Sequence, residues 1–163
     1  MSPEIVTIGV YGWGEEAFFA ALTAARVDVF CDVRARRGLR GAHYAFANSE
    51  RLQARLADLG IRYVHCKELA PAAEIRSLQS AADRSGHTRK RDRRALSPAF
   101  TDAYRRGPLA AFDSAAFLSG LGTDVTRVVL FCVEGQPEAC HRALLADRLA
   151  ADLGAHVVHL LPP

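Results

Sequence analysis

The chain has 163 residues, half of them hydrophobic, and a formal net charge of +3. This length and hydrophobic content predict a single domain over residues 1–163 with a sizeable core. No apolar run reaches the roughly 18 residues of a membrane span, and the N-terminus lacks the basic and apolar regions of a signal peptide. Four unevenly spaced cysteines do not form a secreted disulfide framework, so we expect a cytoplasmic protein with reduced thiols and no membrane partner.

Short apolar segments alternate with helical patterns along the chain. The β-branched segments predict five strands, at residues 4–9, 27–33, 61–66, 126–132 and 155–160. Helices are predicted at residues 15–25, 48–59, 71–82, 98–105, 109–118 and 138–153. This alternation predicts a Rossmann-like α/β fold of three layers, in which about five mostly parallel strands are covered by helices on both faces.

Polar groups follow the second predicted strand, at the edge of the sheet where ligands bind in open parallel sheets. Asp32 and Arg34 alternate along this strand end and are expected to point to the same face. In the functional interpretation, Arg34 binds an anionic ligand and Asp32 orients the site. The alternative is an internal ion pair with another segment.

A glycine-rich turn, GVYGWG at residues 9–14, follows the first predicted strand. Gly12 and Gly14 would let an anion approach the backbone here, although the turn matches neither GxGxxG nor a Walker A pattern. An ordinary tight turn explains the same glycines equally well.

The segment CVEGQPEACHR, residues 132–142, holds two of the four cysteines. Cys132 ends a predicted strand, and the other polar residues lie near the start of the last helix, where free N–H groups and the helix dipole favour an anion and a thiolate. In the leading interpretation, Cys132 is a nucleophile, Cys140 a supporting thiol, His141 the proton carrier and Arg142 an anion clamp.

Two other interpretations of this segment stay open. Cys132, Cys140 and His141 are potential metal ligands, but their spacing differs from the paired CxxC of structural zinc, so no metal is predicted. Alternatively, the cysteines are small buried hydrophobes, and only Arg142 with the helix terminus binds a ligand. The leading interpretation gives a thiol-dependent transferase or hydrolase for a nucleotide or phosphorylated metabolite, with no cofactor and no oligomeric state indicated.

Residues 84–94, RSGHTRKRDRR, contain six basic residues and one acid, so they concentrate the positive charge of the chain. We interpret them as a solvated, mobile loop or as a lid over an anionic substrate. The alternative, a non-catalytic module that contacts nucleic-acid phosphates, would use the side chains of Arg84, Arg89, Lys90, Arg91, Arg93 and Arg94. The absence of aromatic residues from the segment argues against base stacking.

The order VTIG, VFCDVRARR, YAFANSERL, GIRYVHCKEL, LFCVEGQPEACHR and HVVHL resembles the domain-of-unknown-function family number 488 over nearly the whole chain. The resemblance implies a compact α/β fold and no particular activity. It points to the motif positions Asp32, Arg34, Cys132, Cys140, His141 and Arg142. Gly14 and the Ala70-Pro71 pair depart from the family pattern. The DVR segment and the strand-end cysteine are also distantly similar to rhodanese-type sulfurtransferases, whose nucleophile position corresponds to Cys132.

Overall fold

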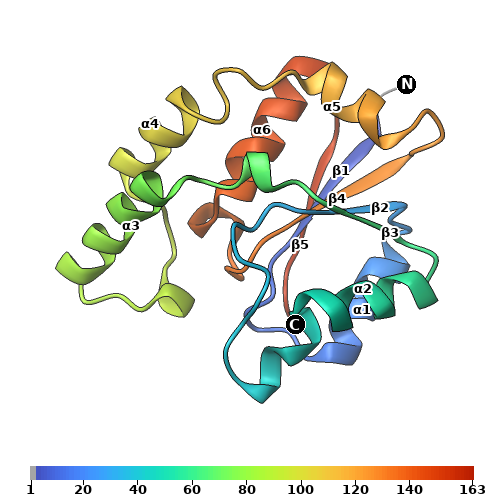
Figure 1. Ribbon diagram of the computed structural model, residues 1–163, viewed down its shortest axis with the longest axis horizontal. Coiled ribbons are helices and arrows are strands. Elements are labelled where there is room, and N and C mark those ends of the chain that lie inside the picture. Colours follow the sequence, from blue (N-terminus) through green and yellow to red (C-terminus); the bar gives the residue numbers. More distant parts are fainter. Residues whose placement is uncertain (1–2) are drawn as a thin grey trace.

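A computed structural model describes residues 3–163 as a three-layer α/β fold (Figure 1). At its centre is an all-parallel sheet of five strands in the order β3-β2-β4-β1-β5. The strands are β1 Glu4–Ile8, β2 Val29–Asp32, β3 Arg62–His65, β4 Arg127–Phe131 and β5 Val157–Leu160. Each strand lies within a segment that the sequence predicted to be extended, so the predicted fold class is confirmed.

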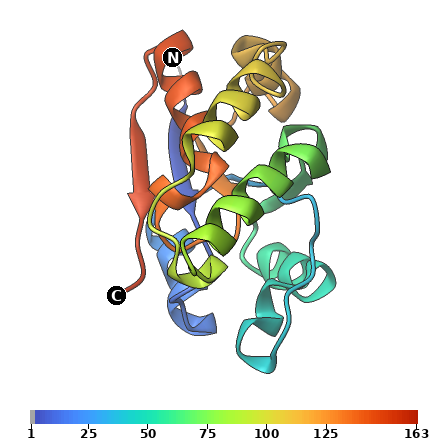
Figure 2. The same ribbon diagram turned by 90° about the vertical axis from the view of Figure 1, so that its left-hand side faces the viewer.

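Helices cover both faces of the sheet (Figures 1 and 2). The α-helices are α1 Glu15–Ala24, α2 Ser49–Asp58, α3 Ala73–Ser85, α4 Pro98–Arg106, α5 Ser114–Leu121 and α6 His141–Leu153. Short 3-10 helices are η1 Ala42–Ala47, η2 Lys67–Leu69, η3 Lys90–Asp92 and η4 Pro137–Ala139. Because crossovers between parallel strands are right-handed, this strand order puts α1 and α2 on one face and α3 to α6 on the other.

An aromatic cluster joins the sheet to α1. The Phe131 ring of β4 lies 4.9 Å from the ring of Phe30 and 5.7 Å from that of Phe18, and Phe18 also contacts Phe46 of η1 at 5.3 Å. All four side chains are buried. Each such ring pair stabilises the fold by about 0.5–1.5 kcal/mol beyond the burial of apolar area. The cluster thereby holds the carboxyl ends of β2 and β4 in fixed positions.

Helices α5 and α6 begin later than the sequence predicted, each because of a local cap. Helix α5 begins at Ser114 because the Asp113 carboxylate accepts a hydrogen bond from the Ala116 amide, at 2.9 Å. Helix α6 begins at His141 because the Cys140 sulfur accepts from the Arg142 amide, at 3.5 Å. The second cap places Cys140 at the N-terminus of a 13-residue helix.

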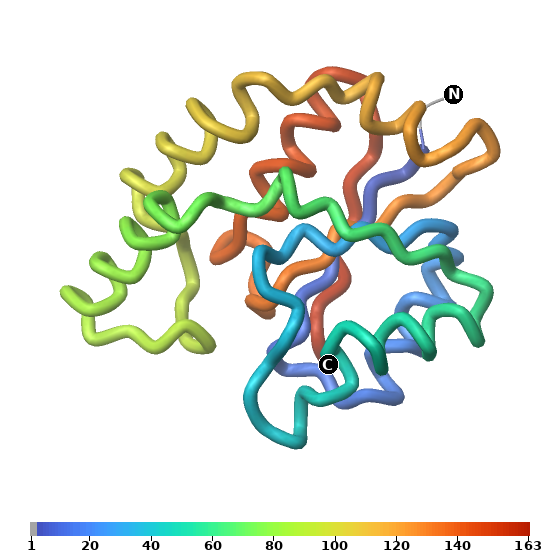
Figure 3. The backbone as a smooth tube through the Cα atoms, viewed as in Figure 1, coloured from blue at the N-terminus to red at the C-terminus, as the bar shows by residue number. Residues whose placement is uncertain are grey.

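The sheet order brings three strand ends together. Strand β4 lies between β2 and β1, and the chain leaves β4 toward one face while it leaves β1 and β2 toward the other. This divergence opens a crevice beyond the carboxyl ends of neighbouring strands, the usual ligand site of such sheets. The backbone trace shows residues 33–48 leaving the sheet as a long excursion that ends at α2 (Figure 3).

No helix within residues 3–163 is both long and apolar enough to cross a bilayer.

Candidate functional site

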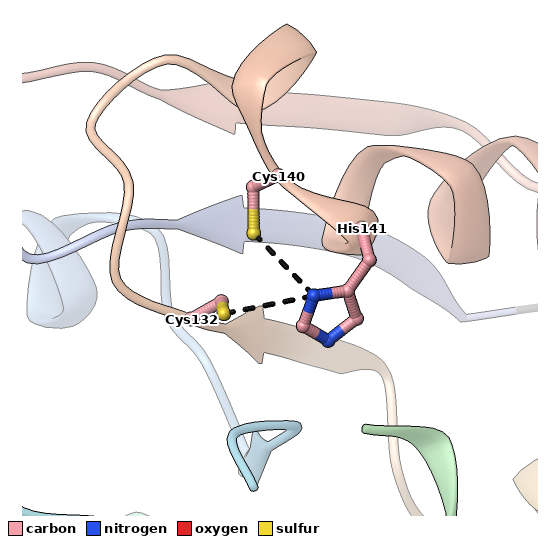
Figure 4. A group of neighbouring side chains, drawn as sticks. All are labelled: Cys132, Cys140 and His141. Atoms are coloured by element: carbon pink, nitrogen blue, oxygen red, sulfur yellow. Dashed lines mark hydrogen bonds between the residues drawn. The ribbon is translucent and has the colours of Figure 1, made fainter. Parts of the chain in front are cut away.

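Two cysteines and a histidine converge at the carboxyl end of β4 (Figure 4). Cys132 directly follows β4, Cys140 caps α6, and His141 is the first residue of α6. The Nδ1 atom of His141 lies 3.8 Å from the Cys132 sulfur and 3.9 Å from the Cys140 sulfur. The potential ligand atoms of the three side chains all lie within 4.8 Å of one another. We call this group the Cys–His cluster.

The His141 ring is held in one orientation. Its Nε2 lies 2.9 Å from the Val33 carbonyl oxygen, and because a carbonyl only accepts, Nε2 must carry a proton. In the neutral ring, Nδ1 therefore presents its lone pair to the two sulfurs. The Tyr104 ring packs edge-on against the imidazole at 5.3 Å, and its hydroxyl donates to the Leu69 carbonyl at 2.7 Å.

The two thiols of the cluster differ in acidity. Burial raises the pKa of the Cys140 thiol, but the hydrogen bond from Cys132 and the charges of Arg142 and His141 outweigh it and hold this pKa well below its ordinary value. The hydrogen bond to Cys140, together with burial, raises the pKa of Cys132 well above its ordinary value. Burial lowers the pKa of His141, yet the Cys140 charge raises it overall. Cys140 is therefore the more acidic thiol of the pair, and Cys132 donates the hydrogen bond between them.

Arg34 and Asp32 form a bidentate ion pair beyond β2. The Nε and Nη2 atoms of Arg34 donate to the two carboxylate oxygens of Asp32 at 2.9 and 2.8 Å, and the Tyr63 hydroxyl donates to the same carboxylate at 2.7 Å. The guanidinium lies 4.7 Å from the centre of the Phe131 ring. Both partners are buried, and the remaining nitrogen of Arg34, Nη1, has no hydrogen-bond partner within the described residues.

A cavity of about 470 Å³ adjoins the cluster and Arg34. Cys132, Cys140 and His141 form part of its wall. The charged residues of the wall are the five basic residues Arg34, Arg36, Arg76, Lys90 and Arg93 and one acid, Glu134. Within residues 3–163, Arg36 and Arg76 form no ion pair. The cavity is therefore electropositive, and Arg34 contributes to its wall a guanidinium whose Nη1 has no partner within the described residues.

Three residues that the sequence predicted to bind an anion, Arg142, Gly12 and Gly14, do not line this cavity. The fully buried Arg142 donates to the Glu134 and Gly135 carbonyl oxygens at 2.5 and 3.2 Å, so it fixes the shape of its own loop. The Gly12 amide donates to the Tyr44 hydroxyl at 3.3 Å, and Gly14 is the N-cap residue of α1. Anion binding by these residues remains a prediction, but their positions favour structural roles.

The glycine-rich turn shapes the cysteine loop through close backbone packing. The amides of Val10 and Tyr11 donate to the Val133 carbonyl at 2.9 and 3.0 Å. A Cβ atom added to Gly9 would lie 1.7 Å from the Glu134 carbonyl oxygen, a separation that no side chain tolerates. The absence of a side chain at Gly9 lets the loops after β1 and β4 lie against each other. The sequence pattern marked this turn but not Gly9 itself.

Part of the basic segment folds onto the cysteine loop. The Arg93 side chain is only 10% exposed and forms ion pairs with Asp83 at 2.9 Å and Glu134 at 3.1 Å. It also donates to the Ala139 carbonyl at 3.2 Å, and Lys90 lies 3.9 Å from Glu134. The remaining basic residues of the segment, Arg84, Arg89, Arg91 and Arg94, are exposed.

Sequence reasoning did not assign Arg76 or Glu134 to the small-ligand cavity, and it named Arg93 only as one of the basic residues of segment 84–94. Arg76 lines the cavity from α3, and its Nε is buried without a partner within the described residues. Burial raises the pKa of Glu134, against the opposing charges of Lys90 and Arg93. Glu134 stood within the quoted cysteine motif, whereas nothing in the local sequence distinguishes Arg76 from a surface arginine.

Comparison with known proteins identifies one family. Residues 15–149 match the family described as domain of unknown function DUF488, a match that covers most of the chain, including Asp32, Arg34 and the cysteine loop. No curated protein and no solved structure matches the chain, and the distant similarity to rhodanese-type sulfurtransferases gains no support from these comparisons. The resemblance to this family is confirmed: the chain belongs to DUF488.

Proposed function

We propose that this protein is an enzyme that binds a small anionic substrate, such as a nucleotide or phosphorylated metabolite, and acts on it through the Cys–His cluster. One observation carries this function: the cluster and five basic side chains line the same cavity. Reactive groups that converge in a concave, charged pocket are the usual form of a catalytic site.

Arg34 supplies the central contact to the anion. Asp32 occupies two of its three guanidinium nitrogens, and the Phe131 ring supports the guanidinium plane, so Nη1 is a donor in a fixed position. A buried donor without a partner costs about 1–3 kcal/mol. An anionic oxygen in the cavity would remove that cost, and Asp32 would thereby orient the site.

The cluster provides the groups that transfer or hydrolysis requires. In the direct route, Nδ1 of His141 takes the proton of the Cys132 thiol as the sulfur attacks the substrate, and the leaving group departs with that proton while the covalent bond to sulfur forms. Water then cleaves this bond with His141 as base and regenerates the thiol. Cys140, whose sulfur accepts the hydrogen bond of Cys132, supports the attacking thiol.

Calorimetric titration with inorganic phosphate and with a nucleoside monophosphate tests the anion site. Arg34→Gln should weaken binding about 10- to 100-fold, the loss expected for one charge-assisted hydrogen bond. Arg91→Gln is the matched control, since it removes the same charge from an exposed position, and it should leave the affinity unchanged. Equal affinities in the wild type and Arg34→Gln would contradict this anion site.

A screen for turnover of phosphorylated compounds tests the chemistry. Cys132→Ser should abolish turnover while the variant still binds the anion, because the substitution leaves the cavity and Arg34 intact. Retained turnover in this variant would overturn the role of Cys132.

A contact with nucleic acid is the second candidate function, favoured by the exposure of Arg84, Arg89, Arg91 and Arg94. Such a contact would weaken steeply with salt and would survive Cys132→Ser. Fluorescence anisotropy with a labelled single-stranded oligonucleotide at low and high salt measures it. Equal binding by a variant with all four arginines changed to glutamine would reject this contact.

A further inference from the structure

We propose that Cys132, Cys140 and His141 bind one zinc ion, with the fourth coordination position open to the cavity. The metal site itself stands on the geometry of the three side chains, whereas its part in catalysis rests on the Arg34 anion site of the proposed function. As zinc ligands, Cys132 and His141 would not be free to act as nucleophile and base, so a water on the open position of the metal would replace the direct route through Cys132. Three protein ligands and one open position are the arrangement of catalytic zinc sites, while structural sites are closed by four ligands.

The separations between the ligand atoms fit a single small ion. Zinc lies about 2.3 Å from sulfur and about 2.0–2.1 Å from nitrogen, so tetrahedral ligands are separated by about 3.5–3.8 Å. The Nδ1 atom of His141 is 3.8 and 3.9 Å from the two sulfurs, and no pair among the three ligand atoms exceeds 4.8 Å. Shifts of a few tenths of an ångström to about one ångström complete the coordination.

The histidine is already oriented as a metal ligand. Its Nε2 bonds to the Val33 carbonyl at 2.9 Å, the kind of outer contact that fixes the tautomer and ring plane of metal-binding histidines. The lone pair on Nδ1 consequently points toward the sulfurs. The Cys140 sulfur in turn accepts a hydrogen bond from the Arg142 amide at 3.5 Å, which stabilises a thiolate ligand.

Charge and chemical softness select the metal. The three side chains are between 1% and 6% exposed, and two buried thiolates are costly unless a cation neutralises them. A divalent ion balances both charges, and sulfur ligands favour zinc over magnesium or calcium. Zinc with an open position lowers the pKa of bound water to about 7 and polarises phosphoryl oxygens, which suits an anionic substrate held by Arg34.

The other buried cysteines provide a matched comparison. Cys31 and Cys66 are also buried and hydrogen-bonded to each other. Within residues 3–163, however, they belong to no group of three potential metal ligands. Replacing one of them removes a buried thiol without touching the proposed zinc site.

Elemental analysis and cobalt substitution test the site. Protein purified without chelator should contain about one zinc ion per chain. After chelation, addition of Co²⁺ should produce the thiolate-to-cobalt charge-transfer absorption of a tetrahedral sulfur site. Cys140→Ser and His141→Asn should each lose the stoichiometric metal and this absorption, whereas Cys66→Ala should keep both.

Circular dichroism establishes whether each variant is folded, and chelator competition on the wild type gives its zinc affinity independently of any variant. The zinc site is overturned if the folded wild type takes up neither metal, or if both ligand variants bind metal as the wild type does. Phosphate titration of the chelated protein separates the two proposals. Arg34-dependent phosphate binding without metal uptake removes the zinc site alone, and metal uptake without phosphate binding removes the anion site alone.

Discussion

The guanidinium of Arg34 is bound by the carboxylate of Asp32, two residues earlier on the same strand end, through two parallel hydrogen bonds of 2.9 and 2.8 Å. Because side chains two residues apart in extended backbone share a face, one tripeptide supplies both the cation and its counter-charge. The sequence analysis offered an ion pair with another segment as the alternative to an anion contact. The observed partner is instead Asp32 of the same strand end, and this pair leaves Nη1 of Arg34 without a partner within the described residues.

Asp32→Asn should destabilise the fold strongly, because it leaves the buried guanidinium of Arg34 without its counter-charge. Breaking a buried pair in this way costs about 3–5 kcal/mol, measurable as a fall in the free energy of unfolding in urea. Glu4→Gln, which breaks the half-exposed pair of Glu4 with Arg127, should cost at most about 1 kcal/mol. Similar losses in the two variants would show that the Asp32–Arg34 pair is not desolvated.

Gly9→Ala should disrupt the cysteine loop, because the new methyl group would overlap the Glu134 carbonyl oxygen. We expect a loss of about 3 kcal/mol in the free energy of unfolding, the upper end of the range for overpacking, together with loss of metal and anion binding. Gly120→Ala is the control. Gly120 lies within α5 with open space around its Cα, so alanine there should be neutral or stabilise by about 0.5–1 kcal/mol.

Arg93→Gln should loosen the basic segment from the cysteine loop, because Arg93 connects Asp83, Glu134 and the Ala139 carbonyl. Amide hydrogens of residues 86–96 should exchange faster, with a loss of stability of about 1–3 kcal/mol. Arg91→Gln, a change in the same segment at an exposed position, should leave exchange unchanged. Unchanged exchange in Arg93→Gln would show that other contacts hold the segment.

Acid should weaken the contact between Asp28 and the start of β4. Burial raises the pKa of Asp28, but hydrogen bonds from Arg127 and Thr126 outweigh it and hold this pKa below the ordinary 3.8. A carboxyl with a depressed folded pKa stabilises the fold above its unfolded pKa, and this stabilisation disappears as the pH falls through the folded pKa.

The difference in unfolding free energy between the wild type and Asp28→Asn should therefore be largest near neutral pH and shrink below about pH 4. Urea unfolding of the wild type and of Asp28→Asn, near neutral pH and below about pH 4, measures this difference. A difference that stays constant with pH would show that the ionised carboxylate of Asp28 adds no stability.

The strands and the cluster were predictable because their signals are local. Each strand is a short apolar run, as expected where parallel strands are covered on both faces, and the three cluster residues lie within one short loop. The start of α5 was predicted too early, at residue 109, although Asp113 is a preferred capping residue and marks its true start. The start of α6 was harder to predict from the sequence, because its N-cap is a cysteine and cysteine is not one of the usual capping residues.

The rest of the site depends on contacts between distant segments. Arg93 reaches Glu134 across 41 positions of sequence, and no local pattern distinguishes it from the exposed arginines beside it. Arg142 stands at a helix terminus, where sequence reasoning expects an anion, yet backbone carbonyls of its own loop accept from two of its three guanidinium nitrogens. Packing decides whether the Arg142 guanidinium binds an anion or backbone carbonyls. Here the close approach of the Glu134 backbone to Gly9 brings the carbonyls within reach.

The position of β1 within the sheet has a consequence for biosynthesis. Both of its neighbours come from the far end of the chain, since Glu4 pairs with Arg127 and Ile5 with Val157. During translation, β1 therefore emerges long before either partner, and the closure of such long loops slows folding. Until residues 127–160 have left the ribosome, an apolar strand stays unpaired and open to aggregation. The centre of the sheet and the cysteine loop are then completed together, so a nascent chain that ends before residue 127 would lack both and would expose β1 to aggregation.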